Sequence, residues 1–218
     1  METEIIAEIG VNWDGNFDYA EFLIRNCKEF GCSAVKFQAF NKDHWKNYPQ
    51  FPNLKNTTIT ENNIQEIDWL CKANKIEWFC TPTYPEAVDW LDLYVHRYKI
   101  RYKDQDNEKL IDRVIETGKP ILISTQDPDA FNSRFKTLYC IPNYPTQYSE
   151  IDFEAIPKFY GYSNHCKDKL APIRAAKLGA KLIEIHVTPN HLQNFIDEPV
   201  SYDMSNLEDV IQCIKALS

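Results

Sequence analysis

The stretch E-I-I-A-E-I-G-V, Glu4–Val11, is a short apolar run with a glycine near its end. A run of this length, apolar on both of its alternating faces, is typical of a buried strand in a parallel sheet. Phe17–Phe30 follows with apolar residues at helical spacing, and Gly31 stands at the position that commonly ends a helix. Ser33–Phe40, S-A-V-K-F-Q-A-F, then has the character of a second strand. This opening therefore predicts a strand, a helix and a second parallel strand.

The same alternation continues to the end of the chain. Further strands are expected at Glu77–Thr81, Tyr94–Tyr102, Pro120–Thr125, Lys136–Ile141, Phe159–Ser163 and Lys181–Thr188. Helices or short helical turns are expected at Thr60–Asn74 (with Thr60 as N-cap), Pro85–Asp92, Asn107–Thr117, Pro128–Ser133, Ile151–Ile156, Lys169–Leu178 and Ser205–Leu217.

Eight strand–helix units predict an α/β fold that closes as a compact TIM (β/α)8 barrel, with residues 1–218 as a single domain. An open doubly wound sheet is the alternative, although no G-x-G-x-x-G dinucleotide motif follows the first strand. The two longest irregular stretches, Asn41–Asn56 and Pro189–Met204, are expected to be functional loops.

Composition and charge exclude several classes of protein. The formal net charge is −8 and Lys and Arg form no run, so a nucleic-acid-binding surface is not expected. No apolar stretch approaches the ~18 residues of a membrane span, and the start of the chain lacks the features of a secretory signal. Seven cysteines without a C-x-x-C pair indicate reduced thiols. A cytoplasmic globular protein is therefore expected.

Strand alternation places charged side chains inside the barrel. The outer face of each strand must be apolar because it meets the helices, so Ile100 and Tyr102 of the fourth strand are expected to face outward. The residues expected to face inward are Ile6, Glu8, Gly10, Lys36, Gln38, Lys99, Arg101, Lys103, Glu184 and His186. One inward charge usually belongs to a core ion pair, but several at the carboxyl ends of barrel strands indicate a site. Lys36, Lys99 and Arg101 predict an anionic substrate with a phosphate and a carboxylate.

Two histidines stand at the ends of neighbouring strands. His165 follows the seventh strand and His186 lies at the end of the eighth, and neighbouring strands are about 4.8 Å apart. Both imidazoles can therefore reach one point beside carboxylates, as in a divalent-metal site with open positions for substrate. Either histidine alone would be an ordinary core residue. His44, His96 and His191 have no comparable partner and are interpreted as loop or surface residues.

Taken in chain order, the motifs resemble those of the sialic acid synthase family, which includes N-acetylneuraminate, legionaminate and pseudaminate synthases. I-I-A-E-I-G-V-N-W-D-G, Ile5–Gly15, is similar to the family's I-I-A-E-I-G-x-N-H-x-G, with Trp13 in place of the usual histidine. The other matches are A-V-K-F-Q at Ala34–Gln38, C-T-P at Cys80–Pro82, K-P-I-L-I-S-T at Lys119–Thr125, N-Y-P-T at Asn143–Thr146, G-Y-S-N-H at Gly161–His165 and L-G-A-K-L-I-E-I-H-V-T at Leu178–Thr188. Together they cover nearly the whole chain.

The resemblance implies a role for individual residues. Phosphoenolpyruvate would be held by Lys36, Thr81, Lys99, Ser124 and Ser163, with Arg101 and Asn143 as further substrate-binding residues. Gln38 would lie near the sugar, and the candidate catalytic residues are Glu8, Asp104 and Asp197. His165 and His186 would bind a divalent metal, Mn2+ in the first place and Mg2+ or Co2+ as alternatives.

The chain also departs from the family pattern. K-I-R-Y-K-D, Lys99–Asp104, stands where the family usually has K-I-x-S-G-E, so Tyr102 replaces a phosphate-binding serine and Asp104 shortens a glutamate. Pro142 stands where an asparagine often contacts ligand. The sequence corresponds to the barrel domain without the family's small C-terminal antifreeze-like domain. Family members commonly dimerise through that domain, so a homo-oligomer of this chain would need another surface.

These observations predict an enzyme that joins phosphoenolpyruvate to an aldehyde sugar with the help of a metal, giving a 2-keto-3-deoxy sugar acid for surface polysaccharide synthesis. The sequence does not specify the sugar. One alternative is a TIM-barrel aldolase or epimerase that kept the metal site without phosphoenolpyruvate. The other is a non-catalytic sugar-binding subunit, against which the retained Glu8, Lys36, His165, His186 and Asp197 argue.

Overall fold

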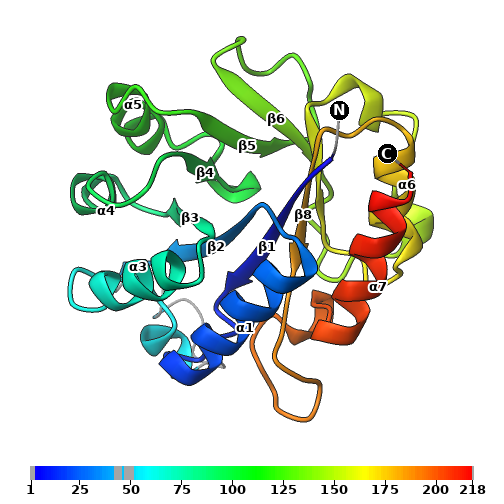
Figure 1. Cartoon of the computed structure of the whole chain (residues 1–218). Coiled ribbons are helices and arrows are strands. Elements are labelled where there is room, and N and C mark those ends of the chain that lie inside the picture. The colour runs from blue at the N-terminus through cyan, green and yellow to red at the C-terminus, as the bar shows by residue number, and fades with distance from the viewer. Residues whose placement is uncertain (1–2, 42–45, 47–51, 218) are drawn as a thin grey trace.

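Eight parallel strands form a closed barrel in the computed structural model, which describes residues 3–41, 46 and 52–217. The strands are β1 Glu4–Gly10, β2 Ala34–Ala39, β3 Glu77–Pro82, β4 Tyr98–Ile100, β5 Ile121–Thr125, β6 Phe135–Cys140, β7 Gly161–Asn164 and β8 Leu182–His186. Each strand pairs with the next, and β1 also pairs with β8, so the sheet closes on itself (Figure 1). The predicted TIM barrel is confirmed, and the open sheet is excluded.

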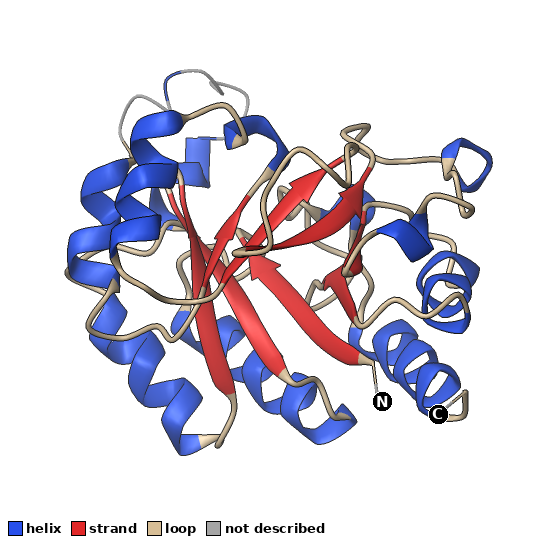
Figure 2. Ribbon diagram, turned by 90° about the horizontal axis from the view of Figure 1, so that it is seen from above, coloured by secondary structure: helices blue, strands red, loops and turns tan. Residues whose placement is uncertain are grey.

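Helices cover the outer side of the barrel (Figure 2). They are α1 Phe17–Phe30, α3 Ile64–Ala73, α4 Pro85–Leu91, α5 Glu108–Glu116, α6 Leu170–Lys177 and α7 Met204–Lys215. Short 3-10 turns are η1 Pro52–Asn56, η2 Tyr102–Asp104, η3 Tyr148–Glu150, η4 Ile156–Lys158 and η5 Glu198–Val200. Within the described part of the chain, no helix is long and apolar enough to cross a membrane.

The first helix shows how the local sequence sets the element boundaries. The side chain of Asn16 accepts a hydrogen bond from the backbone N–H of Asp18 and caps the start of α1. Gly31 adopts a φ of +97° at the other end, a conformation that costs glycine little. Both ends of α1 therefore agree with the prediction.

Two predicted elements are shorter than expected. The strand predicted at Tyr94–Tyr102 is limited to Tyr98–Ile100, because the chain turns into η2 directly after Arg101. The helix predicted at Thr60–Asn74 begins at Ile64. Its N-cap is Asn63 and not Thr60. The backbone N–H of Thr60 donates to the side chain of Asn63 at 2.7 Å.

The segments that follow β5 and β6 contain no α-helix. Residues 128–133 form turns and bends, and η3 and η4 flank the predicted helical turn at Ile151–Ile156. This side of the barrel is therefore covered by short irregular segments.

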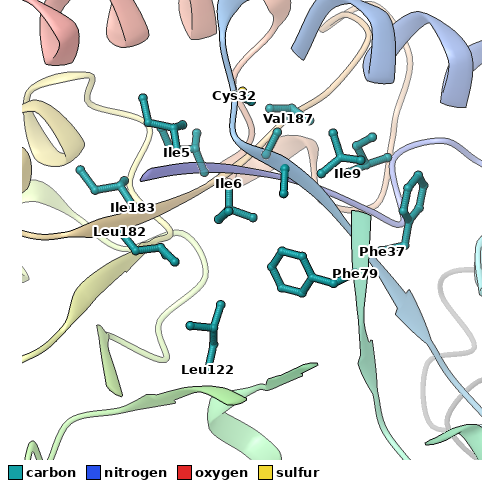
Figure 3. Packing of buried hydrophobic residues seen from close by; sticks show 14 of the residues in the cluster. Ile5, Ile6, Ile9, Cys32, Phe37, Phe79, Leu122, Leu182, Ile183 and Val187 are labelled. Carbon is teal, nitrogen blue, oxygen red and sulfur yellow. The ribbon is translucent and has the colours of Figure 1, made fainter. Parts of the chain in front are cut away.

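The core lies on both faces of the strands. Ile6, Phe79, Leu122 and Leu182 point into the space that the strands enclose (Figure 3). They are at most 1% exposed and close the barrel interior with apolar side chains. In each of their strands an inward polar residue lies two positions later along the chain. The apolar layer therefore forms a floor beneath a polar layer.

Candidate active site

The polar layer opens into a cavity of about 290 Å3 at the carboxyl ends of the strands, where TIM barrels place their active sites. All the predicted site residues except Asp104 and Asn143 line this cavity. The lining includes Glu8, Lys36, Gln38, Thr81, Lys99, Arg101, Ser124, Ser163, His165, His186 and Asp197. Val11, Phe40, Leu54 and Ile196 pack together and give the cavity an apolar wall.

Two lysines and two glutamates form a buried ion cluster within this lining. Lys36 Nζ lies 3.0 Å from Glu8 Oε2 and 3.5 Å from Glu184 Oε2. Lys99 Nζ lies 3.0 and 3.2 Å from the two carboxylate oxygens of Glu184. All four residues are at most 3% exposed. Because a buried charge is costly unless it is paired, each lysine is compensated by a glutamate of the cluster.

The cluster separates the pKa values of its two carboxyl groups. Burial alone would raise the pKa of Glu184, but the charges of Lys36 and Lys99 outweigh it and hold that pKa well below its ordinary value. Burial raises the pKa of Glu8, and Lys36 opposes it only in part. Gln38 donates its amide N–H to the other oxygen of Glu8. The cluster therefore favours the carboxylate form of Glu184, whereas Glu8 takes up a proton more readily than Glu184 does.

The two predicted metal-binding histidines lie side by side, with ring centroids 5.3 Å apart. His165 Nδ1 is 2.9 Å from the carbonyl oxygen of Ile141, which only accepts, so Nδ1 carries the proton and Nε2 keeps its lone pair. Burial, together with His186, lowers the pKa of His165 to about 3. His186 Nδ1 lies 3.4 Å from Asp197 Oδ2. A neutral imidazole, a second imidazole and a carboxylate thus meet at the cavity.

The donor set suits a cation that is bound only in part by the protein. Among residues 3–41, 46 and 52–217, no three His, Cys, Asp or Glu side chains are grouped so as to hold a metal ion. His165 and His186 would supply two nitrogen donors, and substrate and water would complete the coordination sphere. Such an open arrangement is the one that a catalytic metal requires.

Comparison with known proteins places this barrel in a family. The model of the NeuB family matches residues 23–127 and 128–218. The chain belongs to the NeuB family. It is 28% identical to an uncharacterized protein, MJ1065, of Methanocaldococcus jannaschii, covering 98% of this chain and 70% of that protein. It is 27% identical to the N,N'-diacetyllegionaminic acid synthase of Legionella pneumophila (99% and 72%) and 25% identical to the human N-acetylneuraminate-9-phosphate synthase (97% and 69%).

Solved structures agree on the fold of this NeuB-family chain. The N-acetylneuraminic acid synthetase of Leptospira borgpetersenii, in complex with citrate, superposes with a TM-score of 0.91 at 23% identity. It covers 100% of this chain, and this chain covers 84% of it. A truncated 3-deoxy-D-arabino-heptulosonate 7-phosphate synthase of Thermotoga maritima has a TM-score of 0.74 at 13% identity, over 99% of this chain and 86% of that one.

Glu184, Cys140 and Tyr144 also line the cavity, although none of them was among the predicted site residues. Glu184 faces inward, as the alternation of β8 predicted, and the same alternation in β6 would have indicated Cys140. Tyr144 lies on the loop after β6, and its hydroxyl is 3.2 Å from His186 Nδ1. Its ring centroid is 4.8 Å from that of His165. Loops have no residue period, so no pattern could have placed Tyr144 at the histidine pair.

Three residues lie elsewhere than expected: Tyr102 and Asp104 after β4, and Asn143 after β6. Tyr102 lines the cavity and donates its hydroxyl to Gln126 at 3.1 Å, so the prediction that it faces outward is wrong. The cause is the early end of β4, after which strand alternation no longer applies. Asp104 is not part of the cavity lining, because its carboxylate is paired with Arg101. Asn143 also lies outside the lining, is exposed, and donates to Glu150 Oε1 at 2.6 Å.

Trp13 has a packing role here. It is 1% exposed, and its Nε1–H donates to the carbonyl oxygen of Thr57 at 2.7 Å. It thereby ties the end of β1 to the end of the loop predicted at Asn41–Asn56. Residues 42–45 and 47–51 of that loop, His44 included, lie outside the described residues.

Asp197 lies on the loop predicted at Pro189–Met204 and lines the cavity, and Asn12 holds this loop by hydrogen bonds. Asn12 Oδ1 accepts from the backbone N–H of Asp197 at 2.9 Å, and its Nδ2 donates to Val187 O at 2.8 Å and to Ser201 Oγ at 2.9 Å. The hydroxyl of Ser201 in turn donates to the carbonyl oxygen of Asp197 at 2.6 Å. Both backbone groups of Asp197 are therefore held.

His191 lies exposed on the same loop, as predicted, and two carboxylates lie beside it. His191 Nδ1 lies 2.6 Å from Glu198 Oε1, and its Nε2 lies 3.3 Å from Asp203 Oδ2. Glu198 is paired with Lys167 as well, at 2.8 Å. The sequence could not indicate this cluster, because its members meet only after the loop has folded back onto the start of α7.

Replacing Asn12 by alanine should lower the free energy of unfolding by about 2–3 kcal/mol, because it leaves several fully buried polar groups without partners. Urea unfolding followed by circular dichroism measures this. Asn26→Ala is the matched control, since the amide of Asn26 donates to Phe22 O within its own helix, and its effect should stay below about 0.5 kcal/mol. Equal losses in the two variants would contradict the anchoring role of Asn12.

Proposed function

We propose that this NeuB-family barrel joins phosphoenolpyruvate to an aldehyde sugar and releases phosphate and a 2-keto-3-deoxy sugar acid, with the help of a divalent cation. The observation that carries the proposal is the convergence of the His165/His186 pair, Asp197 and the lysine–glutamate cluster on one cavity. The relatives named as legionaminic acid and N-acetylneuraminate-9-phosphate synthases support the same class of reaction.

The chemistry of the lining supports a phosphorylated acid as one substrate. Hydroxyl groups of Thr81, Ser124 and Ser163 lie in the cavity together with Lys36 and Lys99. Hydroxyl and ammonium donors neutralise carboxylate and phosphate oxygens, and in a site shielded from water they do so strongly. The substrate would thus be positioned with C3 of phosphoenolpyruvate toward the aldehyde carbon.

The histidine pair defines the other half of the site. A divalent cation such as Mn2+ bound there would polarise the aldehyde oxygen. Asp197, 3.4 Å from His186, would hold hydroxyl groups of the sugar, and its backbone is kept in place by Asn12 and Ser201. These residues orient the acceptor, and orientation of two reactants supplies a large part of the rate in bond-forming enzymes.

In the proposed reaction, C3 of phosphoenolpyruvate attacks the aldehyde carbon, and the aldehyde oxygen takes up a proton and becomes a hydroxyl group. Water adds at C2, and the tetrahedral intermediate loses phosphate and leaves a keto group at C2. Glu8 is the group proposed to accept the proton of that water. Its carboxyl lies in the cavity, and its raised pKa suits a group that exchanges protons. Asp104, the other candidate for this role, is held by Arg101 outside the lining.

The test is phosphate release by the purified chain with Mn2+, phosphoenolpyruvate and a panel of N-acyl hexosamines and shorter aldehydes. Phosphate release should require both the aldehyde and the metal. It should be absent in His186→Ala, a variant whose folding is checked by circular dichroism. If no aldehyde releases phosphate above this variant, and calorimetry detects no binding of phosphoenolpyruvate, the proposed function is wrong.

A further inference from the structure

Three of the cations that line the cavity, Lys36, Lys99 and Arg101, differ in how closely protein oxygens surround them. Lys36 is enclosed: three oxygens lie within 3.5 Å of its Nζ, from Thr81 at 3.0 Å, Glu8 at 3.0 Å and Glu184 at 3.5 Å. An ammonium group has three N–H donors. The contact with Thr81 is a hydrogen bond, and the contacts with Glu8 and Glu184 are ion pairs. Lys36 therefore acts mainly as the counter-ion of the two glutamates.

Lys99 is occupied to a similar degree. Its Nζ donates to both oxygens of Glu184, at 3.0 and 3.2 Å, and the residue is 1% exposed. One N–H of its ammonium group is left for a ligand. The two lysines of the ion cluster thus offer little capacity for a phosphate group, which carries up to two negative charges and three terminal oxygens.

Arg101 has more donor capacity left. Its guanidinium pairs side-on with Asp104, through Nε to Oδ2 and through Nη2 to Oδ1 at 3.4 Å. A guanidinium has five N–H donors, so three remain. Its central carbon lies 5.6 Å from the ring centroid of Phe40, and its side chain is 26% exposed. The group is thus oriented by a carboxylate and an aromatic ring while it lines the cavity.

The position of Arg101 along the chain suits the group that leaves. Arg101 follows Lys99 by two residues on the same inward side, about 6.6 Å closer to the carboxyl end of the barrel. In the proposed reaction the carboxylate of phosphoenolpyruvate remains in the product, whereas the phosphate departs. A phosphate subsite on the solvent side of the ion cluster lets phosphate leave without passing the buried charges.

We infer that Arg101, held in place by Asp104, forms a subsite for a phosphate monoester dianion, and that Lys36 does not contribute the principal phosphate contact. The inference rests on the proposed function, since phosphoenolpyruvate is the phosphate monoester expected in this cavity. Asp104 is then a positioning residue for the guanidinium. A planar guanidinium matches phosphate with paired hydrogen bonds, which a lysine in its place would not reproduce.

The experiment is calorimetric titration of the whole chain with phosphoenolpyruvate, inorganic phosphate and pyruvate, for wild type, Arg101→Gln, Arg101→Lys and Asp104→Asn. Arg101→Gln should weaken phosphoenolpyruvate and phosphate binding about 10- to 100-fold and leave pyruvate binding unchanged. Arg101→Lys should recover only part of the loss. Lys109→Gln, which removes one positive charge from an exposed position on α5, should leave all three affinities unchanged.

Two further comparisons separate the outcomes. Asp104→Asn should weaken phosphoenolpyruvate binding less than Arg101→Gln does and keep the pH profile of turnover, whereas a proton-transfer role for Asp104 would lower kcat and alter that profile. If Arg101 instead holds a phosphate of the acceptor, Arg101→Gln would abolish a preference for glyceraldehyde 3-phosphate over glyceraldehyde and leave phosphoenolpyruvate binding intact. If the wild type binds phosphoenolpyruvate and Arg101→Gln changes the affinity for no phosphorylated ligand, this inference alone is wrong. If the wild type does not bind phosphoenolpyruvate, the proposed function is wrong.

Discussion

Replacing Glu184 by glutamine should lower the free energy of unfolding by about 3–5 kcal/mol. The carboxylate lies between two buried ammonium groups, within 3.5 Å of Lys36 Nζ and 3.0 Å of Lys99 Nζ. It also accepts a hydrogen bond from the hydroxyl of Ser163 at 2.8 Å. Without its charge, two buried cations would share Glu8, whose own pKa is already raised by burial. An amide of the same size cannot compensate them.

Chemical denaturation of wild type and variant measures this loss, with two controls. Glu116→Gln removes an equivalent ion pair, with Arg113 at 3.0 Å, from a position where the glutamate side chain is 64% exposed, and should cost less than about 1 kcal/mol. The double variant Lys99→Met/Glu184→Gln should be more stable than Glu184→Gln alone, because it removes the cation that was left unpaired. If Glu184→Gln lowered the free energy of unfolding by less than about 1 kcal/mol, water would have to solvate the charges of the cluster.

The direction of the pKa shift also fixes how this stability depends on pH. The pKa of Glu184 is lower in the folded chain than its ordinary value of 4.5, so the folded state binds fewer protons than the unfolded state in acid. The contribution of Glu184 is therefore complete above that ordinary value and is lost as the pH falls below it. The difference in stability between wild type and Glu184→Gln should accordingly be constant at neutral pH and shrink in acid.

Residue periodicity was sufficient to predict the parts of this protein that are regular. The alternation in Glu4–Gly10 and Leu182–His186 follows from burial on two faces, and it identified Glu8, Glu184 and His186 as inward residues before any geometry was known. Apolar spacing and Gly31 likewise fixed both ends of α1. These elements are determined by residues that are close together in the sequence.

The rest depended on contacts that the periods of strands and helices do not describe. Strand β4 ends at Ile100, and Tyr102 therefore lines the cavity although it was expected to face outward. Asp104 pairs with Arg101 and does not line the cavity. Tyr144 and Asn12 gain their places through partners far along the chain, His186 and Asp197. The spacing of residues along the chain does not reveal such partners, and the loops of the site were therefore predicted less well than its strands.

Replacing either His165 or His186 by alanine should reduce metal-dependent phosphate release by about 1,000-fold or more, since loss of the cation removes several kcal/mol of stabilisation from the transition state. The two side chains act as one unit, with ring centroids 5.3 Å apart and His165 oriented by its hydrogen bond to Ile141 O. The double variant should therefore be about as inactive as each single variant, because effects of groups that act together do not add.

Three measurements make this prediction specific to metal binding. The metal content of each variant after dialysis against Mn2+ should fall with activity, while calorimetric binding of pyruvate should persist, because the carboxylate-binding groups are untouched. His96→Ala, which changes an exposed histidine at the amino end of β4, should keep both metal and turnover. Two outcomes would show that the histidine pair is not the metal site, because the proposal assigns both nitrogen donors of the cation to these imidazoles. One is turnover that persists in the double variant. The other is a loss of activity in the single variants while they bind Mn2+ as the wild type does.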